Sequence, residues 1–317
     1  MLNSGYILHS YFDNEMDNIL VKGKVIKRPS ASVKSPYMAD VVLQNEVSEQ
    51  NEVSEQNEVS EQNEVSEQNE VSVQNEVSEQ NEVSEQNEVS DLKNILAHTP
   101  SLGCSGYVDK GKEVLLLPKL GGKTKSSHSI EFAYEENTNI LVGTNPYIAN
   151  SIVYDLLRSN KLEKFKDYDN KNVFREKTKG NSRFDVYIKD NHGVEHFIEI
   201  KTAPVKDFEN NCAIFPKGYR KKKTDPFSPR AIKHLEELTL LAKEENTKCY
   251  LIFMVPRTDV EYFTPCKEDP LYCEAFTKAV EGGVKMISFT STLSENKKNI
   301  VFDRFLPVRF IIKKKNI

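Results

Sequence analysis

The segment 183–201, RFDVYIKDNHGVEHFIEIK, is the strongest constraint on the fold, because it has the pattern of two β-strands joined by a turn. Side chains along a strand alternate between its two faces, so Glu199 and Lys201 point to one side and the neighbouring isoleucines to the other. Asp185 lies on the first strand. Two carboxylates are able to hold Mg²⁺ or Mn²⁺, and a lysine steadies a phosphate or orients the attacking water. The pattern indicates either a metal-dependent phosphodiesterase site or a surface hairpin with scattered charges.

Residues 45–90 are the hexapeptide NEVSEQ, repeated in seven consecutive copies and followed by NEVS, with valine in place of glutamate at Val73. A period of six rotates each copy by about 240° around an α-helix, so the valines would not form an apolar stripe. As a strand, one apolar residue in six buries too little surface to offset the entropy of ordering. We therefore expect a disordered, acidic insert, which is either a passive expanded repeat or an interaction segment.

The repeat also hides the charge of the remaining chain. The 317-residue sequence has a formal net charge of −5, but the repeat contributes 14 glutamates and no lysine or arginine, so the rest carries +9. A basic protein suits a polyanionic partner, although ordinary surface lysines give the same count. The charge therefore favours DNA as a partner.

The cysteines and the first residues predict the compartment. Five cysteines form no CxxC pair, which argues against a zinc ribbon or a disulfide framework and favours a reducing environment. The first twenty residues lack the basic and apolar regions of a signal peptide, and no apolar run has the length of a membrane span. We expect an intracellular protein, cytoplasmic or nuclear, with no membrane partner.

The sequence on either side of the insert predicts a small β domain. Short strand-like runs occur at 19–28, 38–43, 94–98, 112–118, 129–134 and 139–143. Glycine-rich turns separate several of them, which is typical of a small barrel or a meander. Since a long loop costs little closure entropy, the tip of a hairpin tolerates an insertion such as the repeat.

The second half of the chain alternates between helical and strand patterns. Helices are predicted at 145–165, from Ser228-Pro229, and from Asp269-Pro270 to Gly282-Gly283. Strands are predicted at 173–179, 183–189, 196–201, 248–255, 284–289 and 307–312. Up to residue 289 the order is αβββαβαβ, which predicts a mixed sheet with helices packed on it.

This order, with Asp185 on the second strand and Glu199-x-Lys201 on the third, resembles the PD-(D/E)xK restriction-nuclease-like fold, with Phe184 in place of the usual proline. The chain also resembles the sugar fermentation stimulation protein (SfsA) family over nearly its whole length outside the repeat. NPYIANSIVYDLL is similar to the family's N-T-x-x-A-N helix, SRFDVYI to S-R-I-D-F, and HFIEIKTAPV to I-E-V-K-x-V-T-L. IFPKGYRKKKTDPFSPRAIKHLEEL is similar to F-P-D-A-x-T-x-R-G-x-K-H-L-x-E-L with a longer loop, and Lys217 replaces the aspartate.

The resemblance implies an α/β (α+β) architecture of two domains. A small OB-like β domain would occupy residues 15–144 and be interrupted by the insert at 45–90. A restriction-nuclease-like domain, a mixed sheet with flanking helices, would occupy residues 145–312.

The resemblance also implies a site. Asp185, Glu199 and Lys201 are the expected catalytic residues, and Asp185, Glu199 and Asp155 the expected ligands of Mg²⁺ or Mn²⁺ if the protein is catalytic. Glu176 is an alternative to Asp155 as the extra ligand, and His234 lies in the family's K-H pair. The expected nucleic-acid contacts are Lys27, Arg28, Arg220, Lys221, Lys222, Lys223 and Lys233.

Three functions fit these features. The first is a DNA-binding protein of the SfsA family with weak sequence preference, linked to the regulation of sugar use. The second is an active Mg²⁺-dependent nuclease. The third is an interaction protein whose acidic repeat recruits a basic partner.

Overall fold

The computed structural model describes residues 2–11, 20–44, 94–101, 104–119, 124–136, 138–162, 165, 168–218, 220 and 222–310. The NEVSEQ insert at 45–90 and Lys221 lie outside these ranges. Within them, no helix combines the length and the apolar character needed to cross a membrane.

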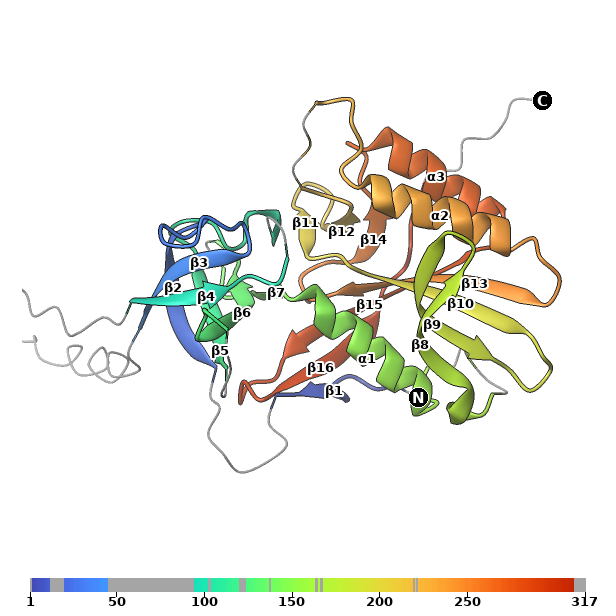
Figure 1. Cartoon of the computed structure of the whole chain (residues 1–317), viewed down its shortest axis with the longest axis horizontal. Helices are drawn as coiled ribbons and strands as arrows, with labels where there is room; N and C mark the ends of the chain where they lie inside the picture. The colour runs from blue at the N-terminus through green and yellow to red at the C-terminus, as the bar shows by residue number, and fades with distance from the viewer. Residues whose placement is uncertain are drawn as a thin grey trace, which may run out of the picture.

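Strands from the first half of the chain form a six-stranded sheet in the order β4-β3-β2-β5-β6-β7. They are β2 (Val21–Lys27), β3 (Met38–Leu43), β4 (Asn94–His98), β5 (Glu113–Pro118), β6 (His128–Tyr134) and β7 (Leu141–Gly143). β4 also pairs in parallel with β6, which closes β2 to β6 into a five-stranded barrel (Figure 1). Alternate apolar residues, such as Val25, Val41 and Val114, fill its interior. The expected OB-like barrel is confirmed.

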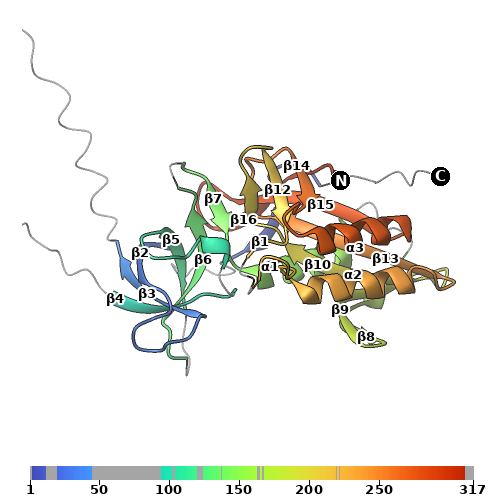
Figure 2. The same ribbon diagram turned by 90° about the horizontal axis from the view of Figure 1, so that it is seen from above.

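Seven strands form the large sheet in the order β1-β16-β15-β13-β10-β9-β8. They are β1 (Ile7–Ser10), β8 (Val173–Lys179), β9 (Ser182–Lys189), β10 (Glu195–Thr202), β13 (Thr247–Val255), β15 (Lys285–Leu293) and β16 (Asn299–Phe305). The central strands β10, β13 and β15 are parallel, and the outer strands run antiparallel to their neighbours. β13 is buried on both faces, as its continuous apolar sequence predicts. Figure 2 shows the barrel beside this sheet, at one end of the molecule.

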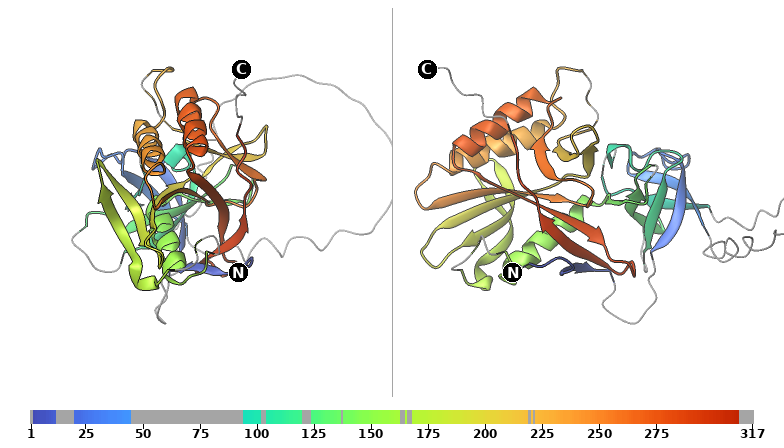
Figure 3. Two further views of the ribbon diagram at one scale, coloured as in Figure 1. Left: turned by 90° about the vertical axis from the view of Figure 1, so that its right-hand side faces the viewer. Right: turned by 180° about the vertical axis from the view of Figure 1, so that it is seen from behind.

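Three helices cover the large sheet, one on one face and two on the other (Figure 3). They are α1 (Pro146–Arg158), α2 (Pro229–Leu241) and α3 (Pro270–Glu281). Each begins with proline after a side chain that accepts a hydrogen bond from the first turn, which fixes its start. The first helix is shorter than predicted, because Asn160 has a left-handed backbone (φ 54°) two residues after its end.

Several elements were not predicted. A third sheet joins β11 (Val205–Asp207), β12 (Cys212–Phe215) and β14 (Tyr262–Pro265), all too short to show periodicity. The predicted strand at 307–312 is wrong over its described residues: β16 ends before it, and Val308 makes only an isolated bridge to Phe263. Two 3-10 turns, η2 (Cys104–Gly106) and η3 (Asn170–Asn172), complete the described elements.

A buried arginine joins the barrel to the large sheet. Arg257, just after β13, is 0% exposed and donates from Nη1 to the hydroxyl oxygen of Tyr107 at 2.7 Å. It also forms ion pairs with Glu135 at 2.9 Å and with Asp259 at 2.7 Å. Tyr107 and Glu135 belong to the barrel half of the chain, so this cluster fixes the two halves against each other.

Candidate metal and nucleic-acid site

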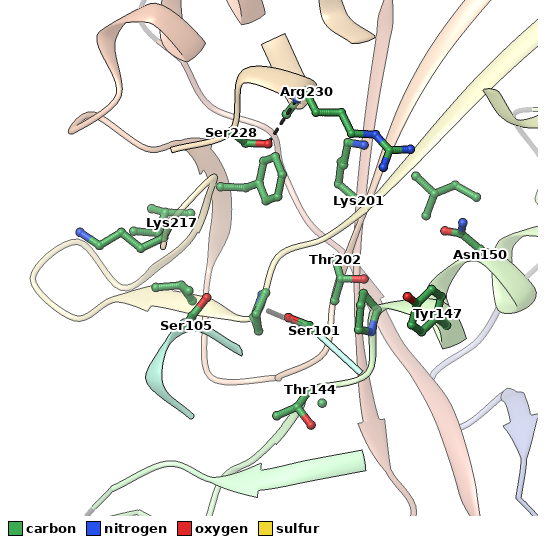
Figure 4. A pocket seen from close by; sticks show the side chains of 18 of the residues that line it. Ser101, Ser105, Thr144, Tyr147, Asn150, Lys201, Thr202, Lys217, Ser228 and Arg230 are labelled. Carbon is green, nitrogen blue, oxygen red and sulfur yellow. Dashed lines mark hydrogen bonds between the residues drawn. The ribbon is translucent and has the colours of Figure 1, made fainter. Parts of the chain in front are cut away.

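A pocket of about 390 Å³ opens where the barrel meets α1, β9, β10 and α2 (Figure 4). It is lined on the barrel side by Ser101, Ser105, Tyr107, Gly143 and Thr144, and on the other side by residues that include Tyr147, Asn150, Asp185, Glu199, Lys201, Lys217 and Arg230. The three predicted catalytic residues therefore lie in one pocket.

Asp185 occupies the point at which two strands separate. β9 and β10 pair only as far as Val186, opposite Ile198. At the next position the Asp185 carboxylate accepts a hydrogen bond from the Ile200 backbone amide at 2.8 Å and another from Asn150 Nδ2 at 2.9 Å. The side chain thus takes the place of the missing strand partner, and its position is fixed from both β10 and α1.

Glu199 is 2% exposed, and its two carboxylate oxygen atoms have different surroundings. Oε1 contacts the Lys201 ammonium and the Nδ1 atom of His234, which reaches it from α2. Oε2 is buried and has no hydrogen-bond partner among the described residues. An unpartnered buried carboxylate oxygen is costly, so this atom is the natural place for an added positive ligand.

The two carboxylates differ in acidity. Burial and, next, the charge of Glu199 raise the pKa of Asp185 to about 6. Burial also opposes ionisation of Glu199, but the hydrogen bond from His234 and the charge of Lys201 outweigh it and lower the pKa of Glu199. At neutral pH both groups are therefore ionised despite their repulsion, which favours a bound cation.

These residues fit a magnesium-type ion. In the described part of the chain, no three His, Cys, Asp or Glu side chains gather as a ligand set. The pocket offers two carboxylates, Asp185 and Glu199. Mg²⁺ is commonly held by one or two carboxylates, while water and substrate phosphate supply its other ligands. The donor set thus suits an open site for a hard cation and not a closed structural site.

Asp155, the expected third ligand, does not reach the pocket. It lies five residues after Asn150 on α1, which turns it by about 140° around the helix axis. Its side chain is 64% exposed and lies 3.8 Å from Arg175. The alternative ligand, Glu176, is also exposed and forms an ion pair with Arg183 at 3.4 Å.

Two of the expected nucleic-acid contacts are engaged within the protein. The Arg28 side chain is 6% exposed and donates to the carbonyl oxygens of Pro36 and Ser101. Arg220 donates to the carbonyl oxygen of Glu268 at 2.9 Å and lies over the ring of Phe227 at 4.3 Å. Both arginines stabilise loops in this structure.

The remaining expected contacts are more accessible. Lys27 on the barrel and Lys222 and Lys223 in the loop before α2 are exposed. Lys233 is half-exposed and lies 3.7 Å from Glu237 on the same helix. Lys221 lies outside the described residues.

Four further residues complete the site: His234 was named from the K-H pair, and the other three were not among the predicted site residues. Asn150 holds Asp185, His234 holds Glu199, and Tyr147 and Arg230 line the pocket. The asparagine of NPYIAN and the histidine of the K-H pair were visible in the sequence as motif residues. Tyr147 and Arg230 had no such signal.

Comparisons with known proteins agree with this architecture. The family model described as "Sugar fermentation stimulation protein RE domain" matches residues 147–297. The sugar fermentation stimulation protein homolog of Thermoanaerobacter sp. (strain X514) is 30% identical over 203 residues, which cover 63% of this chain and 81% of that protein. The homolog of Clostridium perfringens (strain 13 / Type A) is 30% identical over 209 residues, which cover 65% of this chain and 84% of that protein.

A solved structure has the same fold. The structure of Pyrococcus furiosus SfsA in complex with Ca²⁺ matches with a TM-score of 0.64 at 16% sequence identity. The match covers 95% of this chain and 100% of that chain, so it includes both the barrel and the large sheet.

Proposed function

This chain belongs to the sugar fermentation stimulation protein (SfsA) family, and on that premise we propose that it binds DNA and cleaves phosphodiester bonds with a divalent cation. The observation that carries the proposal is the Glu199 carboxylate. Its Oε2 atom is buried without a partner beside Asp185, a second carboxylate whose pKa is raised. Such a pair is a common way for a phosphodiesterase to hold a hard cation.

Each residue of the site has a separate role in this proposal. Asp185 and Glu199 would hold Mg²⁺ or Mn²⁺, and the bound ion would neutralise phosphate charge and make water more acidic. Asn150 and the Ile200 amide keep Asp185 in place. His234 and Lys201 occupy Glu199 Oε1 and leave Oε2 available.

Lys201 has a second role in this proposal. Its ammonium group lines the pocket and is only partly buried, so it is able to donate to a phosphate oxygen or to the attacking water. Arg230 adds positive charge at the same pocket, where it meets the N-terminal part of α2. Positive groups at the place where charge develops stabilise the transition state of phosphoryl transfer.

Two further observations support the choice of ligand. The solved Pyrococcus furiosus relative is a complex with Ca²⁺, a cation that also prefers oxygen ligands. The chain outside the repeat carries a formal charge of +9, which favours DNA as the partner.

A cleavage assay tests this function. Purified protein is incubated with single-stranded DNA, duplex DNA or RNA, with Mg²⁺, Mn²⁺ or EDTA. We expect product only with the divalent ion, and at least about a hundredfold slower cleavage by Lys201→Ala. Asp155→Asn is the matched control, because this exposed carboxylate lies away from the pocket, and it should cleave like the wild type. Equal rates for the wild type and Lys201→Ala would show that the cleavage is not catalysed at this site.

A further inference from the structure

We propose that the pocket accepts a single-stranded segment of nucleic acid and excludes an intact duplex. This inference rests on the proposed function, because it names the substrate class of the same site. Three features of the described residues carry it: the depth of the carboxylates, the fixed position of the barrel wall, and an exposed aromatic ring that lines the same pocket.

The carboxylates are recessed. Glu199 is 2% exposed, and the pocket that reaches it has a volume of only about 390 Å³. Pockets of this size hold a small ligand or a single nucleotide. Enzymes that act on a nucleotide in such a pocket bind single strands or turn the nucleotide out of the duplex. A single strand is able to insert one phosphate and its base, whereas an intact duplex keeps its phosphates on the outside of a wide, stacked helix.

The barrel forms the opposite wall of the pocket, and its position is fixed. The buried Arg257 cluster connects the barrel to the loop after β13, as described above. A second contact lies beside it, where the Gly143 amide donates to the Pro256 carbonyl oxygen at 3.0 Å. The backbones are so close here that a Cβ atom on Gly143 would lie 2.8 Å from Pro256 Cβ. Widening the pocket for a duplex would therefore break buried ion pairs and close packing.

An exposed tyrosine lines the same pocket as the carboxylates. Tyr147, in the first turn of α1, is 67% exposed and lines the pocket (Figure 4). It precedes Asn150 by three residues, so the two side chains lie on neighbouring positions of one helix face, and Asn150 donates to Asp185. Exposed aromatic rings bind single strands by stacking on unpaired bases, an interaction that a base inside a duplex does not offer. Arg230 lines the same pocket and is placed to contact the backbone phosphates, whereas the Lys217 ammonium forms an ion pair with Glu268.

Binding without cleavage tests the inference. Fluorescence anisotropy in EDTA would use the full-length protein and a labelled oligothymidylate of about 20 nucleotides, which is longer than the span of one OB-like barrel. The competitors are the same strand paired with oligoadenylate and an oligouridylate of equal length. We expect at least about tenfold tighter binding of the single strand than of the duplex, and the uridylate shows whether the strand is DNA or RNA.

Variants identify the stacking residue. Tyr147→Ala should weaken binding of the single strand by about 5- to 150-fold, and Tyr147→Phe should retain it because the ring remains. Phe174→Ala is the matched control, since Phe174 is an exposed aromatic residue that does not line the pocket. Equal losses in Tyr147→Ala and Phe174→Ala would overturn the role of Tyr147.

The outcomes separate this inference from the proposed function. Equal affinity for duplex and single strand overturns the inference, whether or not the protein cleaves DNA. Selective, Tyr147-dependent binding without Mg²⁺- or Mn²⁺-dependent cleavage supports the inference and rejects the nuclease. Cleavage of duplex and single strand at equal rates supports the nuclease and rejects the inference.

Discussion

Replacing Asp185 by asparagine should stabilise the protein while it removes a predicted metal ligand. Asparagine has the shape of a protonated aspartic acid and no charge. Its Oδ1 atom accepts from the Ile200 amide as Asp185 does, and its Nδ2 atom donates to Asn150 once the Asn150 amide is flipped. The substitution therefore leaves the hydrogen bonds intact and removes one of two neighbouring negative charges.

The magnitude follows from the pKa of Asp185. This pKa is raised from 3.8 to about 6 by burial and by Glu199. Because the folded pKa lies above the unfolded one, ionisation of Asp185 destabilises the fold as the pH rises from about 4 to about 6. The cost is about 3 kcal/mol above pH 6 and falls to roughly 0.5 kcal/mol near pH 4. Asp185→Asn should be more stable than the wild type by these amounts at each pH.

Urea denaturation in EDTA, followed by circular dichroism at about pH 7.5 and about pH 4, measures the difference. When Mn²⁺ replaces EDTA in the buffer, it should stabilise the wild type and leave the variant unchanged, because the ion binds the pair of carboxylates. Asp155→Asn is the control and should change stability by less than about 0.5 kcal/mol at both pH values. A variant that is less stable than the wild type at neutral pH, or a gain that does not depend on pH, would refute the reasoning.

Two other perturbations have clear expected results. Arg257→Met should lower the free energy of unfolding by about 3–5 kcal/mol, measured by urea denaturation, because it leaves Glu135 and Asp259 without their buried cation; an unchanged midpoint would contradict this. Deleting residues 45–90 changes the formal net charge from −5 to +9 and should preserve or strengthen DNA binding in anisotropy titrations at low salt. Loss of binding after this deletion would instead favour the interaction role of the repeat.

The sequence predicted the large elements because their signals are local. β13 has a long apolar run, and each helix after the barrel begins with a capping side chain followed by proline. The same local reading placed Asp185, Glu199 and Lys201 on adjacent strands, and the structure brings them into one pocket. Their catalytic roles stay predictions until cleavage is measured.

The parts that the sequence did not predict depend on contacts between distant residues. Asp155 has the right residue type on the right helix, but the rotation of α1 turns it away from the pocket. Arg28 and Arg220 looked like phosphate contacts, yet Ser101 and Glu268, each far away in the chain, accept their hydrogen bonds. A count of charges does not tell a cation that binds a ligand from one that stabilises a loop.

The pairing of β1 with β16 decides which fragments of this protein are suitable for study. Residues 7–10 belong to the large sheet, although the whole barrel lies between them and the next strand of that sheet. A fragment cut at residue 145 would lack β1, so β16 would become an edge with unpaired backbone groups, which is a recognised cause of aggregation. Ser10 would also no longer donate to Asn299, a bond of 2.7 Å that joins the two ends of the described chain. Insolubility of such a fragment would therefore reflect the missing β1 strand as well as the missing barrel contacts to Arg257.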